Sequence, residues 1–166
     1  MPPTAVFSHL GIHVTDLPRM QDFYTRVLGL LVMDKGTLAG GNTLCFLSHD
    51  PDQHHQIVLV TGRPPGVEYN VVNQISLKLD TLEDLKTMHA RLKDEGIKEF
   101  GIVTHGNAWS IYFPDPEGNR CELFVDTPWH TPQPYAEPFD LEAPAATIMA
   151  QTEALCRNRP GFTSRA

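Results

Sequence analysis

Apolar and polar residues alternate near the start of the chain, as they do in a strand with one buried face. Over residues 7–14 one face would carry Leu10, Ile12 and Val14, and the other would carry His9, Gly11 and His13. From Asp16 onward the apolar residues recur at helical spacing as far as Leu28. We therefore predict a strand followed by an amphipathic helix that Asp16 caps and that ends before Gly29.

The remainder of the first half contains short apolar stretches separated by turn residues. Strands are predicted around 31–33, 43–48 and 56–61, with Gly40-Gly41-Asn42 and Asp50-Pro51-Asp52 as turns between them. The first module is therefore strand, helix and three strands, and residues 62–66 begin the connector to the second half.

The second half repeats this order at a constant offset of about 65 residues, which places Gln74 at the position of His9 and Val125 at that of Val60. A strand is predicted over 74–79, followed by a helix that begins at Leu82, is capped by Asp80 or Thr81 and ends before Gly96. Three more strands are predicted near 97–100, 108–113 and 120–125.

Two equivalent βαβββ modules, about 7–61 and 72–126, define an α+β fold. Each module would form a curved antiparallel sheet with one face on its helix. The other, polar faces would then close a half-open antiparallel β-barrel around a cleft and line it. We predict one domain over residues 1–141.

The amino-acid composition of the chain changes after Asp126, where prolines become frequent. Residues 127–166 are predicted to form a C-terminal extension packed on the domain, wrapping around it rather than pairing with a sheet. A helix is predicted within it, around 143–157.

Composition narrows the class of protein. The chain has 166 residues, of which 41% are hydrophobic and 20% charged, as expected for an ordinary soluble domain. A formal net charge of -7, with scattered Lys and Arg, argues against a nucleic-acid partner. There is no apolar run long enough for a membrane span and no signal-like N-terminus, so a cytoplasmic location is expected. The 3 cysteines are expected to be reduced and structural.

Several polar residues that could do chemistry share the predicted cleft. Alternation places His9, Gln74 and Glu122 on the face opposite the aliphatic residues of their strands, and the offset places His55 there as well. Imidazole, amide and carboxylate donors on strands of both modules would suit a divalent metal with positions left open for substrate. The alternative to metal binding and catalysis is a structural role for each residue. The histidines would then be hydrogen-bonded, Glu122 would form an ion pair, and Tyr112 would pack among aromatic neighbours.

Two motifs resemble one superfamily. The first is His9-Leu10-Gly11-Ile12-His13-Val14-Thr15-Asp16-Leu17, followed by Phe23-Tyr24 and Val27-Leu28-Gly29-Leu30. The second is Tyr112-Phe113-Pro114-Asp115-Pro116-Glu117-Gly118-Asn119, followed by Cys121-Glu122-Leu123. Together they resemble the opening and closing strands of glyoxalase, bleomycin-resistance and extradiol dioxygenase proteins, which share the vicinal oxygen chelate fold. The resemblance covers roughly residues 7–126.

Within that superfamily, the stretch through His54-His55 to Leu59 looks like the type I extradiol dioxygenases, whose second histidine of such a pair assists proton transfer. The resemblance implies that His9 and Glu122 are metal ligands and that His55, His105 and Tyr112 are catalytic. It implies Fe(II), with a catechol-like aromatic substrate and O₂. Gln74 stands where those dioxygenases carry their second metal histidine, and its harder amide oxygen makes Mn(II) more competitive.

Two other functions remain open at this point. A glyoxalase-like metal-dependent isomerase or lyase would share the fold and would suit Gln74. A metal-free protein that binds a small aromatic ligand, as bleomycin-resistance relatives do, would use the same cleft. The resemblance also favours a homodimer.

Overall fold

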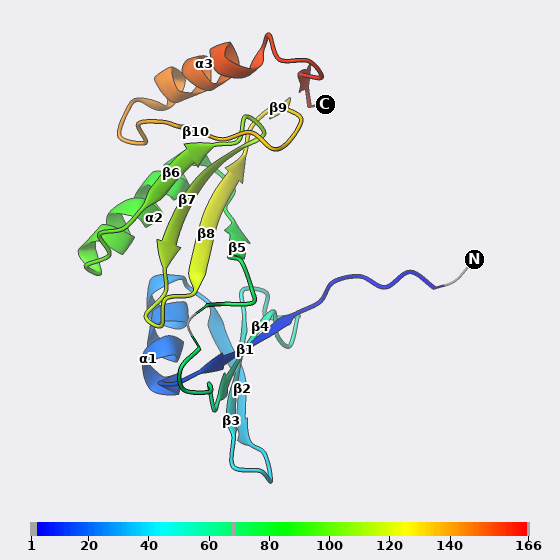
Figure 1. Cartoon of the computed structure of the whole chain (residues 1–166), viewed down its shortest axis with the longest axis vertical. Coiled ribbons are helices and arrows are strands. Elements are labelled where there is room, and N and C mark those ends of the chain that lie inside the picture. Colours follow the sequence, from blue (N-terminus) through cyan, green and yellow to red (C-terminus); the bar gives the residue numbers. More distant parts are fainter. Residues whose placement is uncertain (1–2, 68, 166) are drawn as a thin grey trace. The chain divides into compact units, whose positions relative to one another are not determined.

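The computed structural model describes residues 3–67 and 69–165, and the chain divides into two compact units. The first unit comprises Met1–Asn70 together with Asp115–Gly118, and the second comprises Val71–Pro114 together with Asn119–Ala166. Figure 1 shows the helices and strands of each unit, which are described separately below.

The first unit is a mixed four-stranded sheet with one helical segment. Its elements are β1 (Leu10–Val14), α1 (Leu17–Asp22), the π-helical turn η1 (Phe23–Val27), β2 (Leu31–Thr37), β3 (Thr43–Ser48) and β4 (Ile57–Thr61). The strand order is β1-β4-β3-β2, in which β1 runs parallel to β4 and the other pairs are antiparallel.

The helical segment of this unit begins and ends where the sequence predicts. The Asp16 side chain accepts a hydrogen bond from the Arg19 N–H at 3.0 Å, which satisfies a free donor of the first turn. Met20, Tyr24 and Val27 have no exposed surface, so this face packs into the core of the first unit. Gly29 follows with a φ of 81°, a left-handed conformation that glycine adopts without strain.

The second unit repeats this plan. Its elements are β5 (Ile75–Lys78), α2 (Leu82–Asp94), β6 (Gly101–Thr104), β7 (Ala108–Pro114) and β8 (Arg120–Asp126). These strands are ordered β6-β7-β8-β5, and β5 runs parallel to β8. Thr81 and Asp84 form a reciprocal capping box at the start of α2, and the helix buries Leu82, Leu85, His89 and Leu92.

The predicted α+β fold with two βαβββ modules is confirmed, with corrections to its details. The sheets are mixed rather than antiparallel, because the first strand of each module pairs in parallel with the last. They are open sheets, not closed into a barrel. The strand predicted at 97–100 is wrong: β6 starts at Gly101, and Phe100 instead packs edge-on against His89 of α2 with 4.8 Å between the ring centroids.

The C-terminal residues add β9 (Trp129–His130), β10 (Glu137–Pro138), α3 (Ala145–Cys156) and β11 (Thr163–Ser164) to the second unit. The expectation that this segment pairs with no sheet is wrong, because β10 hydrogen-bonds to the edge strand β6. The indole Nε1–H of Trp109 on β7 donates to Thr152 Oγ1 of α3 at 2.8 Å, and both residues are buried. The segment therefore packs on the sheet of the second unit.

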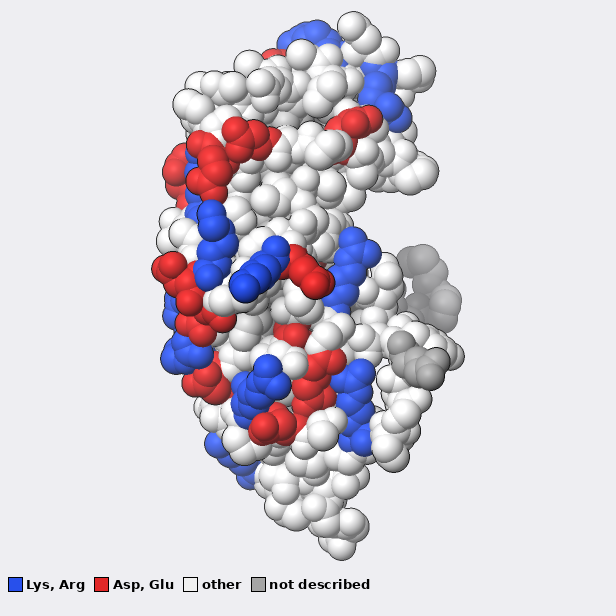
Figure 2. Space-filling model, turned by 60° about the vertical axis from the view of Figure 1, so that its left-hand side comes forward, with Lys and Arg blue, Asp and Glu red and all other residues white. Residues whose placement is uncertain are grey.

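Charged residues on the surface are mixed in sign. On the face drawn in Figure 2, Lys and Arg side chains lie among Asp and Glu and do not gather into a patch of one sign. Among the residues that the structure describes, no helix has both the length and the apolar character that a membrane crossing requires.

Candidate functional site

A row of polar side chains crosses the sheet of the second unit. Ser76 on β5 and Tyr112 on β7 both lie directly opposite Glu122 on β8, which places the three residues side by side on one face. On the far side of Tyr112 the row ends at Gly101 of β6. Gln74, just before β5, joins the row through its side chain.

Glu122 is the buried charge of this row, with 6% of its surface exposed. Its Oε2 accepts hydrogen bonds from Gln74 Nε2 at 2.9 Å and from Ser76 Oγ at 2.5 Å. Both donors are neutral, and within the described residues Glu122 forms no ion pair. A buried carboxylate held only by neutral donors lacks the opposite charge that usually accompanies burial, so a cation would complete it.

Tyr112 lies between this carboxylate and a histidine. Its hydroxyl is 3.0 Å from His105 Nε2, and the Arg120 guanidinium stacks 4.0 Å from the centre of its ring. Burial, followed by the neighbouring Glu122 carboxylate, raises the pKa of Tyr112 to about 12. The phenol therefore keeps its proton near neutral pH.

His105 connects the row to the C-terminal segment. Its Nδ1 is 2.7 Å from the backbone carbonyl oxygen of Tyr135, and Gln133 Nε2 donates to the His105 carbonyl at 2.8 Å. A shallow pocket beside the imidazole is lined by His105 and residues 133–136. The imidazole is thus held on one side by Tyr112 and on the other by this segment.

The first unit holds a separate cluster of imidazoles. The His9 and His55 rings are tilted against each other with 4.1 Å between their centroids, and the Nδ1 atoms of His54 and His55 are 2.8 Å apart. Phe46 of β3 packs edge-on against both His54 and His55, and His54 Nε2 lies 3.8 Å from Asp34 Oδ2. Burial and, after it, the imidazoles of His9 and His54 lower the pKa of His55, which favours its uncharged form.

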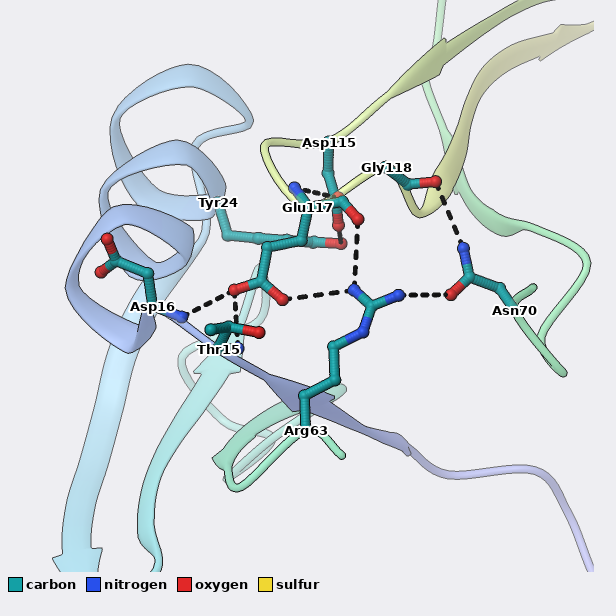
Figure 3. A network of polar contacts seen from close by, with 8 residues as sticks. All are labelled: Thr15, Asp16, Tyr24, Arg63, Asn70, Asp115, Glu117 and Gly118. Carbon is teal, nitrogen blue, oxygen red and sulfur yellow. Dashed lines mark hydrogen bonds and ion pairs between the residues drawn. The ribbon is translucent and has the colours of Figure 1, made fainter. Parts of the chain in front are cut away.

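Figure 3 shows a third polar cluster, in which residues 115–118 are anchored within the first unit. Glu117 Oε1 accepts the backbone N–H groups of Thr15 and Asp16, each at 2.7 Å, and its Oε2 pairs with Arg63 Nη1 at 3.2 Å. Arg63 Nη2 donates to Asn70 Oδ1 at 3.0 Å, and Asn70 Nδ2 donates to the Gly118 carbonyl at 3.2 Å. We call this cluster the Glu117 anchor.

The structure brings the predicted site residues together in pairs. Gln74 contacts Glu122 and Tyr112 contacts His105 in the second unit, while His9 contacts His55 in the first. Across residues 3–67 and 69–165, no group of three or more His, Cys, Asp or Glu side chains is arranged to hold a metal ion. Of the three predicted ligands, only His9 and Glu122 are of these residue types, and the third is Gln74. The ligand set stays a prediction.

Three residues at these sites had no predicted role. The hydrogen bond from Ser76 to Glu122 follows from the register of β5 on β8. The stacking of Arg120 on Tyr112 likewise depends on how β7 and β8 pair. Gln133 lies in a proline-rich stretch whose sequence carries no signal for a contact with His105.

Comparison with known proteins defines the class. Residues 6–123 match the family model described as the glyoxalase/bleomycin resistance protein/dioxygenase superfamily. The chain therefore belongs to this superfamily, and the resemblance seen in its two motifs is confirmed.

Individual relatives differ in what they do. The chain is 31% identical over 131 residues to a biphenyl-2,3-diol 1,2-dioxygenase of Rhodococcus globerulus, a match that covers 76% of this chain and 65% of that protein. It is 25% identical over 119 residues to a probable lactoylglutathione lyase of Synechocystis, covering 69% of this chain and 91% of that protein.

Solved structures agree on the fold. A genomically encoded fosfomycin resistance protein from Listeria monocytogenes, FosX, in complex with Mn(II) and a sulfate ion, superposes with a TM-score of 0.60 at 19% identity. The match covers 75% of this chain and 95% of that one. At this identity the likeness shows the fold alone.

Proposed function

We propose that the protein is a metal-dependent extradiol-type dioxygenase that opens the ring of a catechol-like aromatic compound. The observation that carries the proposal is a histidine associated with two of the three predicted metal ligands: His55 lies against His9, and His105 is linked to Glu122 through Tyr112. Ring cleavage of a catechol requires both removal of a hydroxyl proton and orientation of the two hydroxyl groups, and these residues supply groups for both tasks.

The predicted ligands are a carboxylate, an imidazole and an amide, which are residue types that bind divalent metals. Glu122 would bind the metal through a carboxylate oxygen, His9 through its imidazole and Gln74 through its amide oxygen. The Gln74 amide nitrogen donates the hydrogen bond to Glu122, so the Gln74 amide oxygen takes no part in that hydrogen bond. When bound, Fe(II) or Mn(II) would supply the Lewis acidity and redox chemistry that the protein's own side chains lack.

The chain's residues would handle the protons. His55, whose pKa is lowered, stays uncharged near neutral pH and can accept a proton from a catechol hydroxyl. Phe46, packed against both His54 and His55, would hold the base in place. Tyr112, backed by His105, would form a hydrogen bond with the second substrate oxygen.

The relatives support this function without deciding it. The similarity to the biphenyl-2,3-diol dioxygenase is higher than that to the lactoylglutathione lyase, 31% against 25%. The matched region spans about two thirds of that dioxygenase, 65% of its length, so its whole activity does not transfer directly. The second candidate is a glyoxalase-like isomerase or lyase. It is favoured by the amide side chain of Gln74 and by the similarity to the probable lactoylglutathione lyase.

Oxygen consumption separates the two candidates. The full chain would be loaded with Fe(II) or Mn(II) without oxygen, mixed with a series of catechols, and then exposed to air. We expect oxygen uptake and a yellow ring-opened product, both reduced in His55→Gln. Turnover of a hemithioacetal in the absence of oxygen, with no ring-opened product from any catechol, would instead identify the isomerase or lyase.

A further inference from the structure

The contact between the C-terminal segment and His105 determines where the protons of the Tyr112 pair lie. The Tyr135 carbonyl oxygen, 2.7 Å from His105 Nδ1, can only accept a hydrogen bond. Nδ1 must therefore carry the proton. In the uncharged ring, Nε2 is then a lone pair, and the 3.0 Å contact with Tyr112 requires the phenol to donate.

The segment that supplies this carbonyl is held in place from several sides. Gln133 accepts the Tyr135 N–H at its Oε1, at 3.1 Å, while its Nε2 donates to the His105 carbonyl at 2.8 Å. One amide side chain thus ties the backbone of residue 135 to the backbone of residue 105. Tyr135 is buried, and the Arg159 guanidinium stacks on its ring at 4.2 Å.

We propose that residues 133–135 act as a positioning clamp that fixes the Nδ1–H tautomer of His105 and so directs the Tyr112 hydroxyl proton toward His105. The Tyr112 oxygen then presents lone pairs, rather than its proton, to the face of the sheet that carries Glu122. In the reaction proposed above, on which this inference rests, Tyr112 would accept a hydrogen bond from a substrate hydroxyl.

One alternative arrangement uses the same atoms. If the phenol instead donates its hydrogen bond to the Glu122 carboxylate, His105 must donate from Nε2 as well, which requires a doubly protonated ring. The third state, with the proton on Nε2 alone, would leave Nδ1 facing the Tyr135 carbonyl with no hydrogen between them. The two ring nitrogens give different signals in each of the three states, so the states are separable by nitrogen NMR.

The experiment is a long-range proton–nitrogen correlation spectrum of the histidine side chains in the full chain, recorded without substrate or added metal. At about pH 8 we expect the His105 ring to be protonated at Nδ1 alone. The His105 signals are assigned by their loss in His105→Gln. The same pattern is expected in Tyr112→Phe, because the clamp and not the phenol sets the tautomer.

Variants of the clamp should change the pattern. In Gln133→Ala, and in Gln133→Glu, which keeps the acceptor for the Tyr135 N–H but loses the donor, we expect the two nitrogen signals to move toward each other as tautomers mix. Gln151→Ala, an exposed change on α3, is the matched control and should leave them in place.

The inference is overturned by a native ring protonated at Nε2 or at both nitrogens, by loss of the Nδ1–H state in Tyr112→Phe, or by Gln133 variants with unchanged signals. Because the spectra need no turnover, their outcome is independent of the oxygen-uptake assay. Failure of ring cleavage would remove the proposed reaction and leave the tautomer assignment standing, and the reverse also holds.

Discussion

The Glu117 anchor should make a large contribution to the stability of the fold. The Glu117→Ala change removes a carboxylate whose side chain is 9% exposed, which accepts two backbone N–H groups at 2.7 Å and pairs with Arg63, itself 17% exposed. A hydrogen bond to a charged group contributes about 1.5–3 kcal/mol, and these bonds are not additive because they share one carboxylate. Breaking a buried pair from one side costs about 3–5 kcal/mol, and we expect a loss near the lower end of that range.

Urea denaturation followed by circular dichroism measures this loss as a shift of the midpoint. Glu117→Gln keeps an oxygen that can accept the Thr15 and Asp16 N–H groups and removes only the charge, so about 1–2 kcal/mol should be lost. Glu99→Ala, at an exposed glutamate, is the control and should change the free energy of unfolding by less than about 0.5 kcal/mol. If Glu117→Ala were as stable as Glu99→Ala, the anchor would not contribute as the structure suggests.

Three further changes test separate parts of the account. Gln74→His should raise Fe(II) affinity, measured by anaerobic metal titration, because imidazole suits Fe(II) better than an amide oxygen does; an unchanged affinity would remove residue 74 from the ligand set. Thr152→Val should cost about 1–3 kcal/mol in urea denaturation, because it leaves the buried Trp109 Nε1–H without an acceptor, and a neutral effect would argue against the docking of α3. Burial, and after it Lys93, lowers the pKa of His89 despite the opposing effect of Glu142. The unfolded chain therefore takes up this proton before the folded chain does as the pH falls below about 6.5, so the free energy of unfolding should decrease toward acid pH. His89→Gln should lose part of that decrease, whereas an identical pH dependence of the unfolding midpoint in both proteins would contradict the assignment.

Much of the fold follows from local patterns in the sequence. The helix caps at Asp16 and Thr81 and the apolar spacing after them predict both helical segments, since capping and burial depend on neighbours within one or two turns. Strand direction is not local. Alternation shows which face of β1 or β5 is buried but not whether its partner runs parallel, and the antiparallel prediction failed there.

The strand predicted at 97–100 failed for a related reason. Phe100 supplies the apolar character of that stretch, but in the structure it packs against His89 instead of entering the sheet. Strand β6 begins directly after Phe100, at Gly101, which lies opposite Tyr112. A contact with a helix outweighed the local strand preference.

The residues of the candidate site could be predicted from the sequence, but the contacts among them could not. Its members follow from alternation and from resemblance, but the contacts among them depend on register across strands, as the row Ser76, Glu122 and Tyr112 shows. The clamp on His105 uses a backbone carbonyl of residue 135, and every residue type carries such a group. Sequence patterns therefore could not indicate it.

The most direct test of the proposed metal site is the metal content of the protein purified without chelators, measured by elemental analysis. The native chain and the single variants His9→Ala and Glu122→Ala would be compared, with His13→Ala, an exposed histidine on β1, as control for surface binding. We expect Fe or Mn in the native chain and in His13→Ala, and a large reduction in the other two. Equal metal content in all four proteins, or none in any of them, would contradict the assignment of His9 and Glu122 as ligands.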